Sequence, residues 1–578
     1  MATINNMTFK IAGAAGQGVE SSGAGFSQAL AQGGLHIFGL QDYMSRIRGG
    51  LNFFQVRVHE RPLFVQEDAV HILLPLNEEA LEAYRDEVVQ GGAIIYDDGF
   101  KVDRRTMSNR GRKAMPVPLL DIAKEHGERV MANTAALGAA AGVVEYSYER
   151  LADVIRQNFR RKGGEVVAAN LRVARAAYMY AQEHYGTDFE WKLEQVPESP
   201  QRMIMSGNQA LALGALAGGC RFISAYPMTP ATSVIEWMAK HEEEYGVVIK
   251  HAEDEIAAIN MAIGANFVGA RAMTATSGGG FALMVEALGL AGMCEVPLVV
   301  VEAQRGGPST GLPTRTEQSD LLFVLHASHG EFPRLVVAPG TVEECFDTGW
   351  RAFNLAEKYQ TPVIILTDQL LASSLRTIEV GDIRFDKVEI DRGSLLSQEE
   401  LDALAEPYKR HAFTPDGISP RAVPGHPKAV YATASDEHDE FGHITEYMEN
   451  RRRMMAKRMA KLETARQEIE APQRYGPEQA PLVLVGWGST YGVLREVVDR
   501  LDGEVRLVQF HDLWPFPAEA AADALQGGMV VTVENNFTGQ FKRLLQGETC
   551  IQVDHTICRY DGRSFSPEDV IAGLKEVR

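Results

Sequence analysis

The chain has 578 residues, enough for about three to five domains, and its apolar (45%) and charged (23%) fractions are ordinary for globular proteins. The formal net charge of −20 argues against nucleic-acid binding. No uncharged run reaches the ~18–20 residues of a membrane helix. The first ten residues lack the cationic and apolar segments of a signal peptide, so we expect a cytoplasmic location.

The five cysteines contain no Cys-x-x-Cys pair: Cys220, Cys294, Cys345, Cys550 and Cys558. An iron–sulfur cluster of the [4Fe–4S] type needs four positioned thiolates, some of them closely spaced. We therefore expect no cluster, no zinc finger and reduced thiols in this chain.

The first part of the chain alternates strand and helix patterns, which implies a parallel sheet. Gly13-Ala-Ala-Gly-Gln-Gly lies between a strand that begins at Thr8 and a helix expected from Glu20 to Gln32. Glycines let a helix N-terminus approach an anion closely. The loop departs from GxGxxG, so a tight strand-to-helix turn is the alternative reading. Prolines at 197 and 200 indicate a boundary.

A second loop, Ser45-Arg-Ile-Arg-Gly-Gly, places Arg46 and Arg48 beside a flexible glycine pair. Arginine forks suit phosphate or carboxylate groups. A solvated basic turn explains the same residues equally well.

The segment Tyr226-Pro-Met-Thr-Pro follows a short apolar strand predicted at 220–225. Two prolines make this loop rigid. The carboxyl end of a strand is where an α/β sheet presents ligand-binding groups, and Thr229 offers a hydroxyl there. The alternative is that Thr229 caps a helix whose first residue is Pro230.

Glu255 follows a second predicted strand, 247–249, and opens an Ala-rich helix. An acid in the first helical turn interacts favourably with the helix dipole, and this alone can explain it. The neighbouring acids Glu253 and Asp254 compete with Glu255 for any catalytic assignment.

Two more loops follow predicted strands. Thr274-Ala-Thr-Ser-Gly-Gly-Gly contains Ser277 and Gly278 and leads into a helix, and an ordinary tight turn is its alternative reading. Gln304-Arg-Gly-Gly-Pro-Ser-Thr-Gly follows a Val-rich strand. Arg305 lies at that strand's carboxyl end, where a guanidinium can hold a carboxylate with two hydrogen bonds. A surface arginine in a loop is the alternative.

The rest of the chain is less informative. Residues 381–480 are less regular and contain a basic, Met-rich helix at 451–461, whereas 481–578 read as another α/β unit. The segment 438–446 contains His438 and His443, for which we expect solvated loop positions and assign no role.

Together these motifs resemble the 2-oxoacid:ferredoxin oxidoreductases, most closely an alpha subunit with an N-terminally fused gamma domain of the 2-oxoglutarate type. The resemblance covers nearly the whole chain, and its motifs at 224–320 are specific in combination. It implies an α/β fold of several domains with mainly parallel sheets. These are a gamma-type, coenzyme A-associated domain (1–195), a thiamine-enzyme pyrimidine-binding domain (201–380), a connecting region (381–480) and a C-terminal transketolase-C-like domain (481–578).

The resemblance also implies site roles. The Glu255 carboxyl hydrogen-bonds N1′ of the thiamine aminopyrimidine and favours the imino form, which takes the proton from thiazolium C2. Such an acid needs apolar surroundings to keep its proton, and 256–259 are expected to supply them. Thr229 lies beside the substrate and the thiazolium ring, and Arg305 binds the 2-oxoacid carboxylate. Further cofactor contacts are Tyr226, Pro227, Ser277 and Gly278. Coenzyme A contacts are Gly16, Gln17, Gly18, Ser45, Arg46 and Arg48.

One motif of thiamine diphosphate enzymes is missing. They hold Mg²⁺ and the cofactor diphosphate through a Gly-Asp-Gly segment, but Asp97-Asp-Gly and Tyr560-Asp-Gly lack the first glycine. We therefore expect no metal ligand in this chain. The resemblance implies a beta subunit that brings Mg²⁺, the diphosphate pocket and a [4Fe–4S] cluster, in an (alpha-beta)2 heterotetramer with ferredoxin as electron acceptor.

The implied reaction converts 2-oxoglutarate, coenzyme A and oxidised ferredoxin into succinyl-CoA, CO₂ and reduced ferredoxin, or runs in reverse. Pyruvate or a branched-chain 2-oxoacid is an alternative substrate, because no additional cation can be assigned to the distal carboxylate of 2-oxoglutarate. A non-catalytic regulatory subunit that binds coenzyme A or a nucleotide is an alternative from another class. A transketolase-like sugar enzyme is a third.

Overall fold

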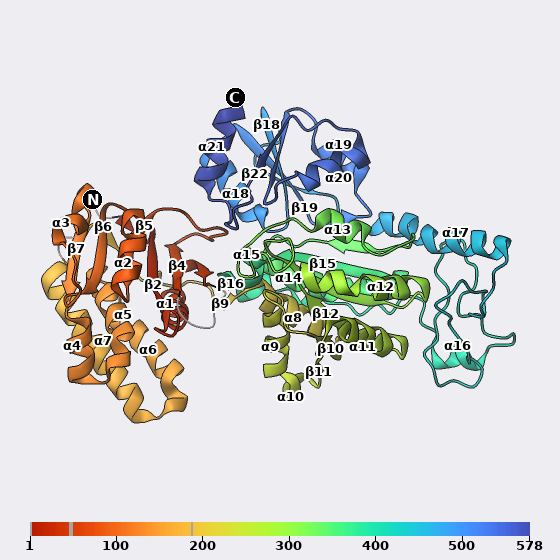
Figure 1. The fold of residues 1–578 in the computed structure, drawn as a ribbon, viewed down its shortest axis with the longest axis horizontal. Coiled ribbons are helices and arrows are strands. Elements are labelled where there is room, and N and C mark those ends of the chain that lie inside the picture. The colour runs from red at the N-terminus through yellow and green to blue at the C-terminus, as the bar shows by residue number, and fades with distance from the viewer. Residues whose placement is uncertain (1–2, 45–49, 187–188, 578) are drawn as a thin grey trace. The chain divides into compact units, whose positions relative to one another are not determined.

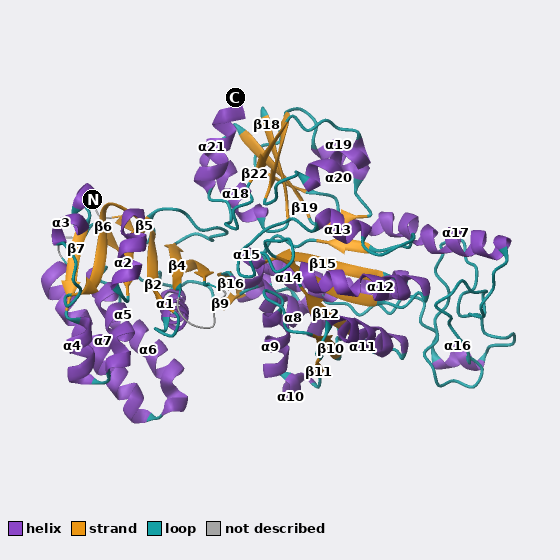
Figure 2. Cartoon of the chain, in the orientation of Figure 1, coloured by secondary structure: helices purple, strands orange, loops and turns teal. Residues whose placement is uncertain are grey.

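The computed structural model describes residues 3–44, 50–186 and 189–577, which form two compact units (Figure 1). Unit 1 comprises Met1–Ser206, Ser374–Asp382 and Ser566–Glu568. Unit 2 comprises Gly207–Ser373, Ile383–Phe565 and Asp569–Arg578. The α/β class with mainly parallel sheets is confirmed (Figure 2).

An eight-stranded mixed sheet organises unit 1, in the order β7-β6-β5-β2-β4-β3-β16-β9. Its strands are β2 (Met7–Ala14), β3 (His36–Asp42), β4 (Leu51–His59), β5 (Val70–Pro75), β6 (Val88–Asp97), β7 (Lys113–Val117), β9 (Arg202–Met205) and β16 (Leu375–Glu379). A small parallel pair joins β1 (Thr3–Ile4) to β8 (Trp191–Lys192).

The prediction of a parallel sheet in the first part of the chain is confirmed only for the strands from β7 to β2 in this sheet. Strands β7, β6, β5 and β2 pair in parallel, but the pairs from β2 through β4, β3 and β16 to β9 are antiparallel. Residues 43–50 alone separate β3 from β4, too few for the crossover that a parallel pair requires.

Five helices bury the main apolar core of unit 1 against the sheet (Figure 1). They are α1 (Val19–Gln32), α4 (Leu119–His126), α5 (Ala132–Val143), α6 (Tyr148–Phe159) and α7 (Gly164–Tyr185). Helices α5 and α7 approach closely, because a Cβ added at Gly138 would lie 2.3 Å from the Ala174 carbonyl oxygen. A separate core cluster involves α2 (Glu78–Tyr84) and α3 (Arg104–Met107).

A seven-stranded sheet organises unit 2, in the order β11-β10-β12-β13-β15-β14-β20, and β20 alone of these runs antiparallel to its neighbour. The strands are β10 (Phe222–Ala225), β11 (Val248–His251), β12 (Ala272–Thr276), β13 (Leu298–Gln304), β14 (Leu335–Val337), β15 (Pro362–Asp368) and β20 (Asp512–Trp514). Its helices are α8 (Gly207–Ala217), α9 (Thr232–Lys240), α10 (Glu242–Tyr245), α11 (Glu255–Phe267), α12 (Gly278–Met293), α13 (Leu321–His326), α14 (Val342–Tyr359) and α15 (Gln369–Ser373).

The C-terminal part of unit 2 contains a five-stranded sheet in the order β17-β19-β18-β21-β22. Its strands are β17 (Gln473–Tyr475), β18 (Leu482–Trp487), β19 (Val505–Phe510), β21 (Met529–Glu534) and β22 (His555–Cys558). The accompanying helices are α18 (Thr490–Arg500), α19 (Ala518–Ala524), α20 (Gln540–Thr549) and α21 (Pro567–Val577). One apolar core runs through this sheet and the seven-stranded one, and β20 joins them.

The region 381–480 contains α16 (Gln398–Asp402) and α17 (Met448–Ala465), and the basic helix predicted at 451–461 lies within α17. Strands β9 and β16 lie within the range 201–380 that the sequence predicts as one domain. In the structure they pair with each other and extend the sheet of unit 1.

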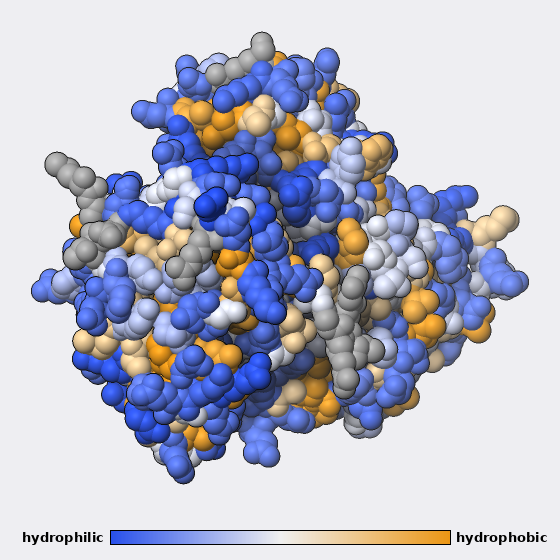
Figure 3. Space-filling view, turned by 60° about the vertical axis from the view of Figure 1, so that its left-hand side comes forward, coloured by the Kyte–Doolittle hydropathy of each residue, from blue (hydrophilic) through white to orange (hydrophobic). Residues whose placement is uncertain are grey.

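The face shown in Figure 3 is mostly hydrophilic, with apolar side chains in separate patches. Among the described residues, no helix combines the length and the apolar character needed to cross a membrane.

Candidate functional site

The predicted site residues of unit 2 gather at one edge of the seven-stranded sheet. Strands β10, β12 and β13 are parallel and adjacent, so the segments that follow them meet at the same edge. These segments are Tyr226–Pro230, Ser277–Gly280 and Arg305–Asp320. Helices α11 and α12 begin at this edge, with Glu255 as the first residue of α11.

The structure distinguishes the three neighbouring acids that the sequence left in competition. Asp254 is the N-cap of α11, and its side chain accepts a hydrogen bond from the backbone N–H of Ala257 at 2.7 Å. Glu253 is exposed. Glu255 is only 5% exposed. Of the three, Glu255 is therefore the carboxyl group that the fold turns inward.

The buried Glu255 carboxyl lies against β12 and the first turn of α12. A Cβ added at Gly280 would be 2.7 Å from Glu255 Oε1 and 2.2 Å from Thr276 Oγ1. Glu255 Oε1 is buried and has no hydrogen-bond partner among the described residues. A buried polar atom without a partner costs free energy, so this oxygen is available to a group from outside the described part of the chain.

The expected apolar surroundings of Glu255 are partly wrong. Ala258 and Ile259 are buried, but Ile256 is 53% exposed. Successive residues of a helix point about 100° apart, so the residue after an inward-facing Glu255 faces outward. The surroundings of the carboxyl are instead Thr276 and Gly280.

A substitution at Gly280 tests the close packing of α12 against Glu255. Gly280→Ala should lower turnover strongly and cost about 1–3 kcal/mol of stability, because its methyl group overlaps Glu255 and Thr276. Gly279→Ala is the matched control, since its nearest neighbour would be the Ser309 carbonyl oxygen at 3.9 Å. Turnover and thermal unfolding of both variants check this, and equal turnover in the two would contradict the contact.

The Tyr226–Pro230 loop is held from two sides. Asn208 Nδ2 donates to the Pro230 carbonyl oxygen at 2.9 Å, and Arg305 Nη1 donates to the Thr229 carbonyl oxygen at 2.7 Å. The peptide bond between Thr229 and Pro230 is cis. Helix α9 begins at Thr232 with Ala231 at its N-cap, so the alternative that Thr229 caps a helix beginning at Pro230 is wrong.

The side chains of this loop differ in exposure. Tyr226 and Pro227 are exposed, whereas Thr229 is half-buried. On the neighbouring segment Ser277 is buried, and its hydroxyl has no hydrogen-bond partner. Asn208, which holds the loop, was not found from the sequence, because an asparagine at the start of an Ala-rich helix carries no distinctive signal.

Arg305 is half-buried among acids. Burial lowers its pKa, and the charges of Asp320 and Glu302 act in the opposite direction. The hydrogen bond to the Thr229 carbonyl oxygen joins the predicted carboxylate-binding arginine to the backbone of Thr229, so both residues belong to one local structure.

Two carboxyl groups whose charges act on Arg305, Glu302 and Asp320, were not identified from the sequence. Glu302 is fully buried, and neither of its oxygens has a hydrogen-bond partner among the described residues. Burial, with the charges of Asp320 and Asp368, raises the pKa of Glu302 well above its ordinary value. Burial and Glu317 raise the pKa of Asp320 to about 6, against the effect of Arg305. The sequence contained one indication of Glu302, because it is a charged residue at the end of the apolar run Leu-Val-Val-Val-Glu.

Gln318 holds the segment before Asp320 against the C-terminal part of unit 2. It is fully buried, and its backbone N–H donates to the Asn535 carbonyl oxygen at 2.7 Å. Its side chain donates to the Trp487 carbonyl oxygen at 3.0 Å. Gln540 Nε2 donates to the Ser319 carbonyl oxygen at 2.6 Å. The C-terminal sheet therefore determines where Asp320 lies.

The expectation of solvated histidines is wrong for His438, which is fully buried, while His443 is exposed. The ligand atoms of His438, His411 and Glu295 lie within 4.8 Å of one another. Lys457 and Lys461, however, bind the two Glu295 oxygens at 2.6 and 2.5 Å. Burial opposes ionisation of Glu295, but these lysines hold its pKa well below the ordinary value. A metal ion would have to displace them, so this group is an ion-pair cluster.

The Gly-rich loop of unit 1 forms the predicted strand-to-helix turn before α1. Gly16 and Gly18 have φ of +88° and +75°. Gln17 Oε1 accepts hydrogen bonds from the Ala14 backbone N–H and from Asn77 Nδ2, both at 2.7 Å. The side chain of Gln17 thus closes the turn, and this geometry is compatible with both readings of the loop. Ser45, Arg46 and Arg48 lie outside the described residues.

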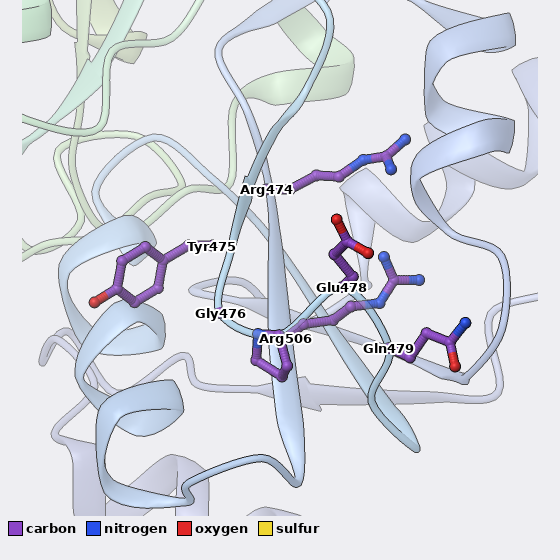
Figure 4. A pocket seen from close by; sticks show the side chains of 7 residues that line it. Arg474, Tyr475, Gly476, Glu478, Gln479 and Arg506 are labelled. Atoms are coloured by element: carbon purple, nitrogen blue, oxygen red, sulfur yellow. The ribbon is translucent and has the colours of Figure 1, made fainter.

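A recess of about 540 Å³ lies in the C-terminal part of unit 2 (Figure 4). Arg474 and Arg506 line it with residues 475–479. The two guanidinium groups already have partners, since Arg474 pairs with Asp523 and Arg506 donates to the Gln526 carbonyl oxygen. None of the predicted site residues lines this recess.

Comparisons with known proteins identify the family of this chain. Residues 213–457 match the family model "Pyruvate flavodoxin/ferredoxin oxidoreductase, thiamine diP-bdg", and residues 8–180 match "Pyruvate ferredoxin/flavodoxin oxidoreductase". The 2-oxoacid:ferredoxin oxidoreductase subunit alpha of a Sulfolobus species is 34% identical, across 99% of this chain and 97% of the relative. The 2-oxoglutarate oxidoreductase subunit KorA of Mycobacterium tuberculosis is 30% identical, across 98% and 91%.

A solved structure is similar over its whole length. This is the 2-oxoglutarate:ferredoxin oxidoreductase from Magnetococcus marinus with 2-oxoglutarate, coenzyme A and succinyl-CoA bound. It is 35% identical, with a TM-score of 0.92 and coverage of 99% of both chains. The chain therefore belongs to the 2-oxoacid:ferredoxin oxidoreductases, as the alpha subunit of a thiamine diphosphate-dependent enzyme.

Proposed function

We propose that this chain is the alpha subunit of a 2-oxoglutarate:ferredoxin oxidoreductase. The complex would convert 2-oxoglutarate, coenzyme A and oxidised ferredoxin into succinyl-CoA, CO₂ and reduced ferredoxin, or run the reverse reaction. The observation that carries the substrate assignment is the full-length similarity to the Magnetococcus marinus enzyme, at 35% identity and a TM-score of 0.92.

The residues around Glu255 fit a thiamine aminopyrimidine. Among the described residues, Glu255 Oε1 is a buried oxygen without a hydrogen-bond partner, and the glycine at 280 lets the first turn of α12 pack directly against this carboxyl. The Ser277 hydroxyl is a second buried group without a partner in the described part of the chain. When bound, the cofactor supplies the means of stabilising the electron pair left by decarboxylation.

Three residues of this chain then have defined tasks. Glu255 would hydrogen-bond the ring nitrogen of the cofactor through Oε1 and serve as its proton partner. Arg305 binds the 2-oxoacid carboxylate with its guanidinium, and the Thr229 hydroxyl orients the keto group. The rigid loop with Tyr226 and Pro227 forms one side of the site, and the segment that contains Ser277 and Gly278 forms the other.

The incomplete site and its surroundings support a beta subunit as partner. The sequence lacks the Gly-Asp-Gly segment that holds Mg²⁺ and the cofactor diphosphate. Near the starts of helices α11 and α12, Ile256 and Leu283 are each 53% exposed. Exposed apolar groups at a helix surface are typical of protein interfaces. The beta subunit would bring Mg²⁺ and a [4Fe–4S] cluster, and ferredoxin would accept the electrons.

The coenzyme A site is proposed in unit 1. The Gly16–Gly18 turn precedes α1, whose N-terminus points backbone N–H groups outward, a suitable place for a phosphate. Ser45, Arg46 and Arg48 remain proposed contacts of the same ligand.

A substrate panel tests the proposed function. The complex purified with its partner should show a kcat/KM for 2-oxoglutarate at least roughly tenfold above those for pyruvate and branched-chain 2-oxoacids, with methyl viologen as acceptor. A preference for pyruvate would overturn the substrate assignment. Purification without a cluster-bearing partner, or turnover independent of thiamine diphosphate, would instead favour a regulatory subunit.

A further inference from the structure

The recess in the C-terminal part of unit 2 is lined by two arginines from adjacent strands, Arg474 of β17 and Arg506 of β19. Arg474 pairs with Val508, which lies two residues after Arg506 on β19, so the two arginines share one face of the sheet. In Figure 4 both side chains extend to the same side of β17. The Tyr475 ring points to the other side, where its hydroxyl donates to Asp499 at 2.7 Å. The strand register thus places two guanidinium groups at one recess.

Arg506 is buried in the wall of the recess with hydrogen-bond donors left over. The residue is only 5% exposed. Its Nη2 donates to the Gln526 carbonyl oxygen, but Nε is buried and has no hydrogen-bond partner among the described residues. No carboxylate in the described part of the chain forms an ion pair with this guanidinium. A buried charge without a counter-ion costs free energy, so an anion bound beside Arg506 would be stabilised.

Arg474 adds a second positive charge rather than a counter-charge. Burial, and then the charge of Arg474, lower the pKa of Arg506. Arg474 itself is exposed and pairs with the exposed Asp523. Exposed ion pairs are weak, so this one leaves Arg474 able to contact a ligand. Two like charges that face one recess favour an anion between them.

The segment that follows β17 adds backbone donors to the recess. Residues 476–479 line it, and the backbone N–H groups of Glu478 and Gln479 donate to no acceptor among the described residues. Glu478 also carries the one carboxylate among the lining residues, and it forms no ion pair within the described part of the chain. The recess therefore offers free donors, and its single negative group is not bound to either arginine.

The recess and the candidate site lie at opposite edges of the five-stranded sheet. Strands β18, β19 and β21 are parallel. Arg506 is the second residue of β19, and residues 476–479 precede β18. The groups that hold the Arg305–Asp320 segment are at the other ends of the strands, since Trp487 is the last residue of β18 and Asn535 follows β21. A ligand in the recess would thus be separate from the candidate site.

We propose that this recess is a second ligand site of the chain, which binds a phosphate group between Arg506 and Arg474. A phosphate group carries close to two negative charges near neutral pH and several acceptor oxygens, so it can use both guanidinium groups and the free N–H groups of 478–479. The volume of about 540 Å³ admits inorganic phosphate or the phosphate ester of a small metabolite. The site stands apart from the proposed function, which its failure would leave untouched.

The test titrates the complete complex, saturated with thiamine diphosphate, by isothermal calorimetry at constant ionic strength. Inorganic phosphate and glycerol 3-phosphate are the two probes. Tighter binding of the ester supports a phosphorylated metabolite as the ligand, and equal or tighter binding of inorganic phosphate supports the free ion. Phosphate sites elsewhere on the complex contribute equally to wild type and variants, so the differences between them report on the recess.

Five variants give changes of opposite sign. Arg506→Gln should weaken binding about tenfold or more, as for a lost charged hydrogen bond. Arg474→Gln, at an exposed position, should weaken it about two- to fivefold, and it decides the result if the Arg506 variant fails to assemble. Asp523→Asn frees Arg474 and Glu478→Gln removes a negative charge, so each should tighten binding about two- to fivefold. Arg543→Gln is the matched control, since it removes an exposed arginine from the same part of unit 2, and should stay within about twofold of wild type.

Three results would overturn the site. The first is that neither probe binds to the wild-type complex. The second is that Arg506→Gln and Arg474→Gln both bind the probes as tightly as wild type does. The third is that neither Asp523→Asn nor Glu478→Gln tightens binding, because a merely structural role of the arginines would not make the removal of nearby acids favourable.

Discussion

Glu255→Gln is expected to lower kcat by about 10²–10⁴-fold, the range typical of a lost general acid or base. Glutamine has nearly the same shape as glutamate and can form a hydrogen bond, but it cannot pass a proton to the cofactor ring. Because Glu255 Oε1 has no hydrogen-bond partner in the part of the chain that the structure describes, the substitution breaks no described hydrogen bond at that atom. Folding and assembly with the beta subunit should therefore be unchanged.

The measurement is 2-oxoglutarate-dependent reduction of methyl viologen by the complete complex, together with thermal unfolding. Glu253→Gln is the matched control, since the same change is made two residues earlier at an exposed position. It should leave kcat within about twofold of wild type, in keeping with the small effects of surface substitutions. Near-normal turnover of Glu255→Gln would remove Glu255 from the chemistry, whatever the control shows.

Arg305→Ala is expected to reduce kcat/KM for 2-oxoglutarate by about 2–4 kcal/mol, roughly 30- to 900-fold, as for loss of a buried charged hydrogen-bond pair. The guanidinium supplies both the charge and the planar fork that match a carboxylate. Arg305→Lys keeps the charge without the fork, so it should lie between wild type and Arg305→Ala.

Two controls isolate the effect of Arg305 on substrate. Arg384→Ala removes an exposed arginine paired with Asp386 and should have no effect on kcat/KM. Thermal unfolding reports separately on the lost contact with the Thr229 carbonyl oxygen, which amounts to about 1–3 kcal/mol. If kcat/KM of Arg305→Ala equals that of wild type, the carboxylate is bound elsewhere.

Local patterns predicted most of the elements at the site. The strands predicted at 220–225 and 247–249 correspond to β10 and β11, and α11 begins at Glu255 as expected. An apolar run that ends at glycine or proline predicts a strand and a turn from neighbouring residues alone, without knowledge of tertiary contacts. The resemblance to a family rested on the order of such patterns along the chain.

Pairing between distant segments was not predictable in the same way. Strands β9 and β16 are about as long as other strands of the chain, but they lie far apart in the sequence and join the sheet of unit 1. Their sequences predict an extended conformation but do not predict which strand each one pairs with. The pairing depends on which sheet edge is free when the rest of the chain has folded. The domain boundaries predicted at 195, 201 and 380 therefore stay predictions.

The sequence by itself determined which loops carry the chemistry and that Gly-Asp-Gly is missing, because both are properties of contiguous residues. Tertiary structure alone decided the burial of individual side chains. It turned Glu255 inward and used Asp254 as a cap, buried His438 beside Glu295, and placed Asp320 against Gly278. Burial and hydrogen-bond partners arise from packing between distant segments, and those two properties decide which of several neighbouring acids faces the site.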